Sequence, residues 1–278
     1  MSGALWIVGT PIGNLDDLTP RAARALTEAD VIACEDTRVT RVLFTRLEAR
    51  PHARMVAYHA RNERQRTPEL VRAVESGSRV ALVTDAGMPG LSDPGHRLVA
   101  ACAAKGLRIE VIPGPSAVPA ALIVSGLPTA RFVFEGFLPR TGAARRRRIA
   151  ALADESRTIV LFESPHRVVE TLRELADALG PRPAALAREL TKVHEEVVRG
   201  TLPELADAVG ARGARGELTL VIEGSVAEPA AEQAPEDLAR AVADHVEAGM
   251  TKKEAIAAVA GERGVPKRSV YHAVVNLG

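Results

Sequence analysis

The feature that most constrains the fold of this chain is the strict alternation of two kinds of segment in residues 1–114. Continuously apolar runs, typical of buried strands, alternate with segments that carry helix signals. Thr19-Pro20 and Thr67-Pro68 both predict helix starts, because threonine caps a helix and proline favours its first position. This alternation predicts an α/β domain with a largely parallel sheet. The predicted strands lie at 4–9, 30–36, 79–85 and 108–114, and the predicted helices at 19–29, 67–77 and 95–106.

After a crossover at 113–128 the alternation restarts, which predicts a second α/β domain. Its strands are expected at 131–137, 157–164, 183–191 and 216–224, and its helices at 166–180 and 201–210. A stretch rich in alanine, proline and acids then predicts a linker, and three short helices follow it. The predicted organisation is two α/β domains at 1–117 and 118–225, a linker at 226–235, and a small helix-turn-helix-like module at 236–278.

Composition limits the function classes. The net charge is +1, so contact with nucleic acid has to come from local patches of cations. Aromatic residues make up 3% of the chain, which argues against a broad base-stacking platform. Cys34 and Cys102 form no metal-binding or redox motif and are predicted to be buried in a protein of the reducing cytoplasm. We expect no metal site, no signal peptide and no membrane span.

Three turns rich in glycine and proline follow predicted strands of the first domain. They are "GTPIGNLDD" at 9–17, "DAGMPGLSDPG" at 85–95 and "PGPSA" at 113–117. None is a P-loop or a G-x-G-x-x-G fingerprint. Because α/β sheets bind ligands at the carboxyl ends of their strands, three rigid turns there predict that they converge on one ligand cleft.

Further motifs occur between and after these turns in a characteristic order. They are "CEDTR", "GLPTARFVFEGFLPR", "FESPHR" and "RELTKVHEE". With them the chain resembles the bacterial 16S rRNA cytidine 2′-O-methyltransferases of the tetrapyrrole methylase superfamily. The resemblance covers nearly the whole chain. It implies S-adenosylmethionine as methyl donor, a donor cleft between the two α/β domains, a homodimer, and 16S rRNA within the 30S subunit as substrate.

The resemblance also implies a set of donor contacts. At one position the chain departs from the family pattern, because relatives usually carry threonine where this chain has Met88, so only a backbone contact would survive there. Asp85 could pair with the cationic groups of the donor, or could instead brace its loop. The implied contacts are Pro11, Ile12, Gly13, Asp85, Ala86, Gly87, Met88, Ser116, Ala117, Phe162, Ala187 and Gly216.

The segment "ARELTKVHEE" holds the candidate catalytic residues. Methyl transfer to a ribose hydroxyl needs a base for its proton, or a cation that stabilises the developing oxyanion. Lys192 suits either role, since a buried lysine can have a lowered pKa and act as a base. Glu189 is the alternative base. The opposing interpretation is a solvated stretch of charges.

Clusters of cations are the candidate RNA contacts. Arg145, Arg146, Arg147 and Arg148 form an uninterrupted run after "LPRTGA", which predicts a lid that grips phosphate, or alternatively an exposed helix start. Lys267 and Arg268 fall in the first turn of the last predicted helix, where a helix-turn-helix protein contacts nucleic acid. A looser cluster consists of Arg61, Arg64 and Arg66.

Two motifs allow two interpretations each. "CEDTR" at 34–38 predicts either an internal ion-pair network or a substrate contact. Arg167 of "FESPHR" could bind phosphate or pair with Glu170. For the whole chain, the alternatives to an rRNA methyltransferase are a methylase of a tetrapyrrole or a protein residue, and a non-enzymatic helix-turn-helix regulator.

Overall fold

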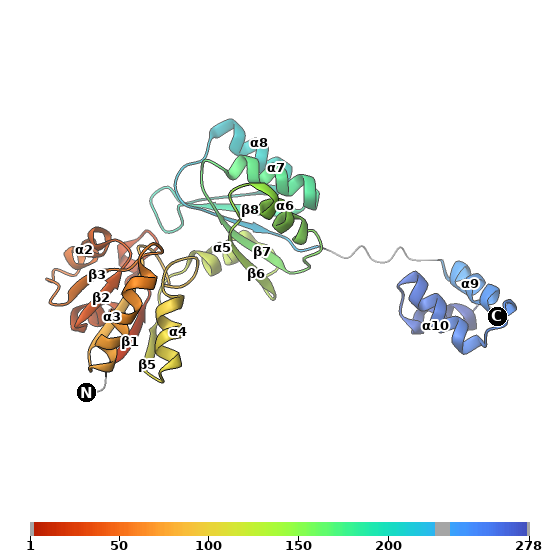
Figure 1. The fold of residues 1–278 in the computed structure, drawn as a ribbon. Helices are drawn as coiled ribbons and strands as arrows, with labels where there is room; N and C mark the ends of the chain where they lie inside the picture. Colours follow the sequence, from red (N-terminus) through yellow and green to blue (C-terminus); the bar gives the residue numbers. More distant parts are fainter. Residues whose placement is uncertain (1–2, 226–233, 277–278) are drawn as a thin grey trace. The chain divides into compact units, whose positions relative to one another are not determined.

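The computed structural model describes residues 3–225 and 234–276, which belong to two compact units, Met1–Ser225 and Val226–Gly278. Among these described residues, the first unit contains two five-stranded sheets with their helices, and the second contains three helices (Figure 1). The prediction of two α/β sheets followed by a helical region is therefore confirmed. The domain boundary near residue 117 stays a prediction, because both sheets lie within one compact unit.

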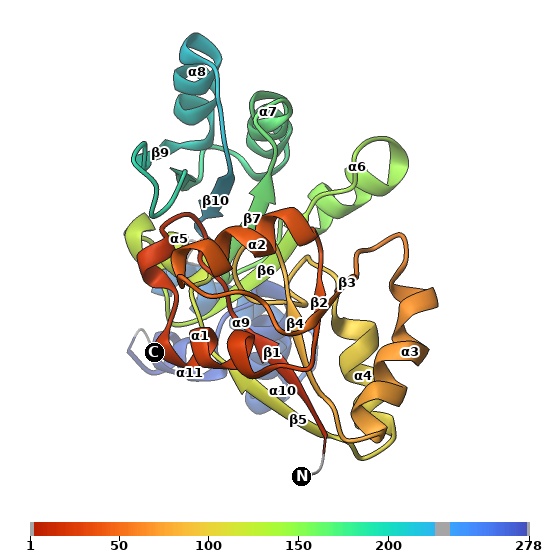
Figure 2. The ribbon, with the colours of Figure 1, turned by 90° about the vertical axis from the view of Figure 1, so that its left-hand side faces the viewer.

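The first sheet is entirely parallel, with strand order β3-β2-β4-β1-β5. Its central strands β1, β2 and β4 are almost completely buried, which explains why they are continuously apolar in sequence. The core places α1 and α2 on one face and α3 and α4 on the other, where α3 and α4 lie side by side (Figure 2). The strands are β1 Ala4–Val8, β2 Val31–Cys34, β3 Arg54–Ala57, β4 Arg79–Val83 and β5 Arg108–Ile112; the helices are η1 Leu15–Asp17, α1 Pro20–Glu28, α2 Thr37–Arg46, α3 Glu63–Glu75 and α4 His96–Ala104.

One predicted helix start is wrong. The Thr19-Pro20 signal does begin α1, and the Thr19 hydroxyl accepts the backbone N–H of Ala22. The same signal at Thr67-Pro68 lies inside α3, which begins at Glu63. The Thr67 hydroxyl instead donates to the carbonyl of Glu63, one turn earlier, and bonds the hydroxyl of the buried Tyr58 at 3.0 Å. Tertiary packing therefore extends the helix across a proline that the sequence pattern reads as its first position.

The second sheet has the order β6-β7-β10-β8-β9 and is mixed, because only β6 and β7 pair in parallel. Helices α6, α7 and α8 pack on one face of it, and α5 packs on the other. The edge strand β9 was not predicted, since its half-exposed sequence has no apolar run. The strands are β6 Phe132–Phe137, β7 Thr158–Glu163, β8 Pro183–Arg188, β9 Glu196–Thr201 and β10 Leu218–Ile222; the helices are α5 Ala117–Ser125, α6 Gly142–Ala151, α7 Val168–Leu179 and α8 Leu202–Arg212.

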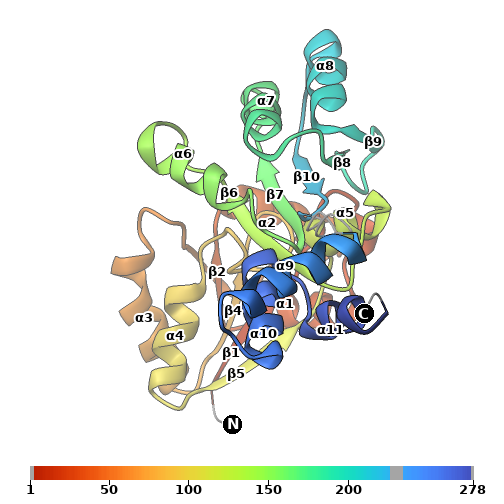
Figure 3. The ribbon, with the colours of Figure 1, turned by 90° about the vertical axis from the view of Figure 1, so that its right-hand side faces the viewer.

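The second unit is a bundle of α9 Pro235–Glu247, α10 Lys252–Arg263 and α11 Lys267–Asn276 around a small core (Figure 3). A capping box at Thr251 and Glu254 begins α10, and Gly264 in the left-handed conformation ends it. Residues 226–233 of the predicted linker lie outside the described residues. Within the part of the chain that is described, no helix is long and apolar enough to cross a membrane.

Candidate active site

The three glycine and proline turns of the first sheet meet because β4, β1 and β5 are neighbours in the sheet. Thr10, just after β1, pairs with Gly87 through two backbone hydrogen bonds of 2.9 and 3.2 Å. The buried Thr10 hydroxyl also donates to the carbonyl of Thr84, at 3.1 Å. These bonds fix the turn after β1 against the turn after β4.

Glycines allow the turns after β1 and β5 to approach each other closely. A Cβ atom on Gly9 would lie 2.6 Å from the backbone nitrogen of Gly114 and 2.6 Å from Met88 Sδ. Gly87 has a φ of +79°, a conformation that a side chain would strain. The sequence needs glycine at these positions because three backbones share one small space.

Below these turns lies a cavity of about 350 Å³, which the second sheet closes. The end of β7 and the start of β10 supply its other wall. The prediction that the three turns converge on one cleft is thus confirmed. The lining residues are Ile12, Ala86, Gly87, Met88, Leu91, Ser92, Asp93, Ser116, Ala117, Val118, Phe137, Phe162, Glu163, Ser164, Pro165, Gly216, Glu217, Leu218 and Thr219.

Most of the residues implied as donor contacts line this cavity; the exceptions are Pro11, Gly13, Asp85 and Ala187. Ala187 is buried in the core beneath the cavity. Gly13 lies against the other candidate residues, since a Cβ there would be 2.4 Å from Lys192 Cγ. The cavity brings the remaining positions together, and their contacts with a donor stay a prediction.

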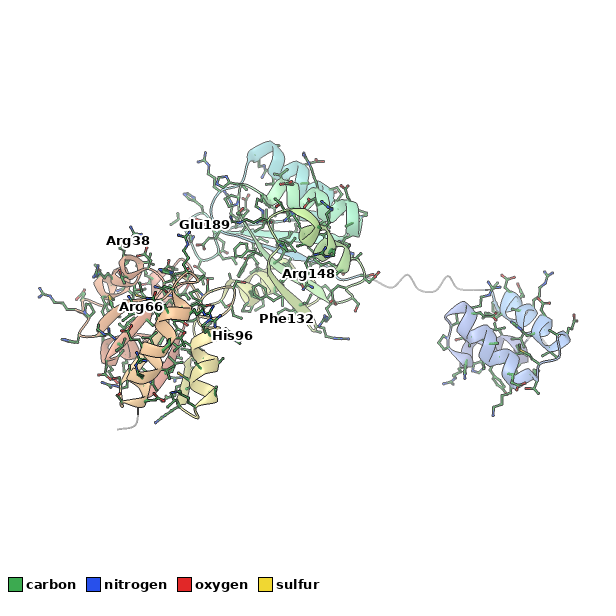
Figure 4. All side chains as sticks on the ribbon, viewed as in Figure 1. Arg38, Arg66, His96, Phe132, Arg148 and Glu189 are labelled. Carbon is green, nitrogen blue, oxygen red and sulfur yellow. The ribbon has the colours of Figure 1, made fainter. Side chains whose placement is uncertain are left out.

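Asp85 acts as a brace in this structure. Its Oδ1 accepts the backbone N–H of Asp36 at 3.0 Å, and so holds the turn that follows β2. Burial raises the pKa of the Asp85 carboxyl. In the same turn Arg38 pairs with Asp36 at 2.6 Å, yet its side chain is 85% exposed at the outer surface (Figure 4). "CEDTR" therefore forms a single ion pair at the surface and not the predicted internal network, while the alternative of a substrate contact stays a prediction.

Asp93 is a cavity residue that the sequence analysis missed. It follows the turn after β4 and lines the cavity beside Leu91 and Ser92. Burial, together with the nearby charges of Glu35, Asp85 and Glu217, raises the pKa of its carboxyl to about 7. Asp93 is the second aspartate of the motif "DAGMPGLSDPG", and nothing in the sequence distinguishes its role from that of the first, Asp85.

Glu163 also lines the cavity, but both oxygens of its carboxylate already have partners within the protein. Its carboxylate accepts the N–H of Ser164 at 2.7 Å and the hydroxyl of Thr171 at 2.6 Å, and pairs with Arg167 at 3.3 Å. Arg167 also donates to the carbonyl of Leu138 at 3.2 Å. Arg167 pairs with Glu163 and not with Glu170, while its predicted bond to phosphate stays a prediction. "FESPHR" instead fixes the wall of the cavity.

Lys192 and Glu189 lie at the rim of the cavity, behind Glu217. Lys192 Nζ is 2.8 Å from Glu189 Oε1 and 3.3 Å from Glu217 Oε2. Glu189 Oε1 also accepts the backbone N–H of Glu217 at 2.9 Å. Figure 4 shows Glu189 at the end of β8, on the side of the second sheet nearest the first.

These bonds decide the protonation states. Desolvation lowers the pKa of Lys192, but the hydrogen bond that it donates to Glu189 and the charge of Glu217 outweigh this effect, so that its pKa is raised. The hydrogen bonds from Lys192 and from the Glu217 backbone lower the pKa of Glu189. The expectation of a lysine with a lowered pKa is therefore wrong for this state. Lys192 fits the role of a fixed cation, and Glu189 is a weak base.

The turn that carries these residues is strained and tied to the first sheet. Glu189 and Thr191 have positive φ values of 51° and 67°. The Thr191 hydroxyl accepts the backbone N–H of Asn14, at 3.1 Å. Gly216 is required beside it, because a Cβ there would lie 2.3 Å from Glu189 Oε1. The strained turn thus connects the two walls of the site.

The predicted four-arginine grip is wrong for Arg145. Its side chain is only 3% exposed and donates to Glu174, to the Thr171 hydroxyl and to the carbonyl of Pro139. Arg145 and Ile149, one turn apart, both face the core of the second sheet, whereas Arg146 and Arg147 are exposed.

The other predicted cations remain accessible to different degrees. Arg148 of α6 pairs with the buried Glu135 at 2.6 Å, and its own side chain is half exposed (Figure 4). Arg66 pairs with Glu69 at 3.0 Å, while Arg61 and Arg64 are exposed. In the second unit, Lys267 and Arg268 are exposed in the first turn of α11.

Comparison with known proteins identifies the family. Residues 4–206 match the model of the Tetrapyrrole (Corrin/Porphyrin) Methylases. The chain is 49% identical to "Ribosomal RNA small subunit methyltransferase I" of Mycobacterium tuberculosis (strain CDC 1551 / Oshkosh), over 99% of this chain and 95% of that protein. It is 42% identical to the protein of the same name from Synechocystis sp. (strain PCC 6803), over 99% of this chain and 98% of that protein.

Solved structures show the same fold at lower identity. The cobalt precorrin-4 methyltransferase CbiF superposes with a TM-score of 0.60 at 22% identity, over 79% of this chain and 94% of that chain. The uroporphyrin-III C-methyl transferase from Thermus thermophilus, complexed with S-adenyl homocysteine, superposes with a TM-score of 0.54 at 24% identity, over 80% and 97%. With the full-length relatives, these matches show that the chain belongs to the tetrapyrrole methylases and, within them, to the ribosomal RNA small subunit methyltransferase I family.

Proposed function

We propose that this chain transfers a methyl group from S-adenosylmethionine to the ribose 2′-hydroxyl of a cytidine in 16S rRNA of the small ribosomal subunit. The observation that carries the proposal is the cavity between the two sheets, which has an acidic side chain on its wall and a fixed lysine at its rim. The names of the relatives at 42–49% identity support the choice of rRNA as substrate.

The cavity fits the methyl donor. Its volume of about 350 Å³ is in the range of small-ligand sites, and its lining is largely apolar with exposed backbone at glycine and alanine, which suits an adenosine. When bound, S-adenosylmethionine would supply a methyl carbon on a positively charged sulfur. Asp93 is the cavity carboxylate without a fixed partner among the described residues, so it is our candidate counter-charge for the cationic groups of the donor. The backbones of Ala86, Gly87 and Ser116 would hold the remainder.

We assign Lys192 the role of stabilising the ribose oxygen. With the donor bound, the ribose oxygen would take the methyl group, and its hydroxyl proton would pass to solvent water because Glu189 is a weak base. A cation at hydrogen-bond distance from that oxygen stabilises the negative charge that develops there. Lys192 has three donors and its carboxylate partners hold it protonated, so it can turn one donor toward a substrate at the rim. Alignment of donor and ribose at the cavity supplies the rest of the catalysis.

RNA contact is assigned to exposed cations of α6 and of the second unit. Arg146 and Arg147 are the members of the α6 run that are exposed, with Arg148 half exposed beside them. Lys267 and Arg268 supply further positive charge. On a protein of net charge +1, such local clusters have to provide the attraction to phosphates.

We further propose that the enzyme is a cytoplasmic homodimer. Large apolar side chains are exposed on the edge strands and on α5: Phe132 of β6 (Figure 4), Val111 of β5, and Ile123, which is 71% exposed. Exposed apolar groups of this size favour association with a second copy.

The test uses S-adenosylmethionine with a labelled methyl group. The protein is incubated separately with naked 16S RNA, 30S subunits, a DNA pool and a porphyrinoid. We expect label in the RNA of 30S subunits and resistance to alkaline cleavage at one position, because a methylated 2′-oxygen cannot attack its phosphate. Label in the porphyrinoid would instead assign the chain to small-molecule methylation. Absence of label in every arm would favour a non-enzymatic regulator.

A further inference from the structure

The second unit contains a groove that the methyl-transfer site does not explain. It lies between α10 and α11 and has a volume of about 740 Å³. Lys252 and Lys253 of α10 line it together with Lys267 and Arg268 of α11. Tyr271 and Ile256 contribute apolar surface to the same groove.

The cations of this groove are free of acidic partners. Among the described residues, none of the four takes part in an ion pair, whereas many arginines near the two sheets do. The acids of the unit that the structure describes do not line the groove. Glu254 bonds its own helix cap and Glu262 pairs with His245, at 3.1 Å. The α11 helix itself has no acidic residue. Positive charge is thus concentrated along one groove of a small bundle.

The aromatic side chain decides what kind of polyanion fits. Tyr271 is 53% exposed, although it is one of only two tyrosines in the chain and the other is fully buried. A ring held at an exposed position beside an apolar wall offers a flat surface for stacking. Duplex nucleic acid presents phosphates and base edges to a protein, while its base faces are stacked inside. An apolar groove with an exposed ring therefore suits an unpaired base better than a duplex.

We propose that the groove between α10 and α11 binds an unpaired RNA segment, with a base stacked on Tyr271 and the flanking phosphates held by Lys252, Lys253, Lys267 and Arg268. The inference deepens the proposed function, on which it rests, by assigning the second unit to single-stranded rather than helical RNA. One ring suffices for this role, so the low aromatic content of the chain is no obstacle. The unit would contribute affinity, while the cavity of the first unit carries out the chemistry.

The test measures binding of the full chain to a labelled 12-nucleotide RNA by fluorescence anisotropy, without methyl donor. The probes are the single strand and the same strand annealed to its complement. We expect the single strand to bind more tightly, and Tyr271→Ala to weaken that binding by roughly tenfold, the usual effect of losing one stacked base. Tyr271→Phe keeps the ring and should stay within about twofold of the wild type.

The cations are tested through the salt dependence. Changing Lys252, Lys253, Lys267 and Arg268 to alanine should lower the slope of log affinity against log salt by about 0.7 for each phosphate that the protein no longer neutralises. The matched control is Arg263→Ala, an exposed cation in the last turn of α10 outside the groove, which should leave the slope unchanged. Wild-type affinity of Tyr271→Ala for the single strand, or tighter binding of the duplex by the native chain, would overturn the inference.

These outcomes are separable from those of the proposed function. Calorimetry with S-adenosylmethionine and methyl transfer to 30S subunits report on the first unit. If the native chain neither binds the donor nor transfers label, the proposed function fails whatever the groove binds. If both succeed while Tyr271→Ala keeps full affinity for the single strand, only the groove assignment fails.

Discussion

Two carboxylates at the active site, Asp93 from the first sheet region and Glu189 from the second, are in opposite electrostatic states. Asp93 is half buried among other acids, and its pKa is raised to about 7. Glu189 receives hydrogen bonds from Lys192 and from the Glu217 backbone, and its pKa is lowered. The same functional group is thus easily protonated on one wall and firmly ionised on the other.

The difference separates two tasks. A carboxylate with like-charged neighbours and no fixed partner is suited to bind a cationic ligand, because the cation reduces the repulsion between the carboxylate and those neighbours. A carboxylate that already holds a lysine orients that lysine and keeps it charged. The comparison therefore predicts that Asp93 acts in donor affinity, whereas the Glu189–Lys192 pair acts in methyl transfer.

The largest effect is expected at the lysine. Lys192→Ala should reduce kcat by about 10²–10³, the usual effect of losing one donor that stabilises an oxyanion, while the Kd for S-adenosylmethionine changes little. Single-turnover methyl transfer and calorimetry measure the two quantities. Lys192→Arg, which keeps the positive charge, should recover part of the rate. A Lys192→Ala enzyme that turns over normally would reduce this pair to a surface ion pair.

The next effect concerns Asp93 and pH. Because its pKa in the free protein is about 7, a cationic donor that needs the carboxylate must displace a proton below that pH. The Kd of the native protein should therefore rise about three- to fivefold from pH 7 to pH 6 and stay level above pH 8. Asp93→Asn should bind the donor about tenfold more weakly at pH 8 and show no such dependence.

The control for this experiment is Asp177→Asn, which alters an exposed carboxylate near the end of α7 that does not line the cavity. It should reproduce the native pH profile of donor binding. A pH-dependent Kd that persists in Asp93→Asn would locate the titrating group elsewhere and would break the comparison between the two walls.

The sequence predicted the framework of the site well. The alternation of strands and helices, with glycine and proline after β1, β4 and β5, was sufficient to predict where the turns lie. Their convergence follows from the adjacency of these strands in a parallel sheet. Local rules therefore specify backbone positions such as Gly9 and Gly87 with little ambiguity.

The sequence could not predict electrostatic states, because these depend on neighbours that are distant in the chain. The pKa of Asp93 is set by burial and by the charges of Glu35, Asp85 and Glu217. Arg145 is not available to phosphate because it forms an ion pair with Glu174 of another helix. A signal existed for Arg145 alone, since its spacing of four residues from Ile149 puts both on one face of a helix. Helical periodicity therefore has to be considered before every residue in a run of charged residues is predicted to be exposed.

A smaller effect is expected on stability. The Asp93 carboxyl has a raised pKa in the folded protein, so between about pH 4 and pH 7 the native state binds a proton that the unfolded state has lost. Its stabilising contribution is complete below pH 4 and is lost as the pH rises through 7. Asp93→Asn should therefore have a larger free energy of unfolding than the native protein at pH 8, by about 1 kcal/mol after allowance for partial exposure.

Urea denaturation at pH 8 and at pH 4 measures this difference, which should disappear at the lower pH. Equal stability of the two proteins at pH 8 would mean that the acids around Asp93 do not repel it in the folded state. Asp93 would then lose its distinction from Glu189.

The smallest effect separates the acids that act on Asp93. Glu35 is the first of the neighbouring charges that raise the pKa of Asp93, and Glu217 contributes less. Both Glu35→Gln and Glu217→Gln should move the pH midpoint of donor affinity downward, with the larger movement for Glu35→Gln. Because Glu189 still holds Lys192 when Glu217 is neutral, Glu217→Gln should change kcat by less than about threefold. Calorimetric pH profiles of donor binding show which variant has the larger shift in its pH midpoint. A larger shift for Glu217→Gln would mean that the second sheet, rather than the turn after β2, controls the charge of Asp93.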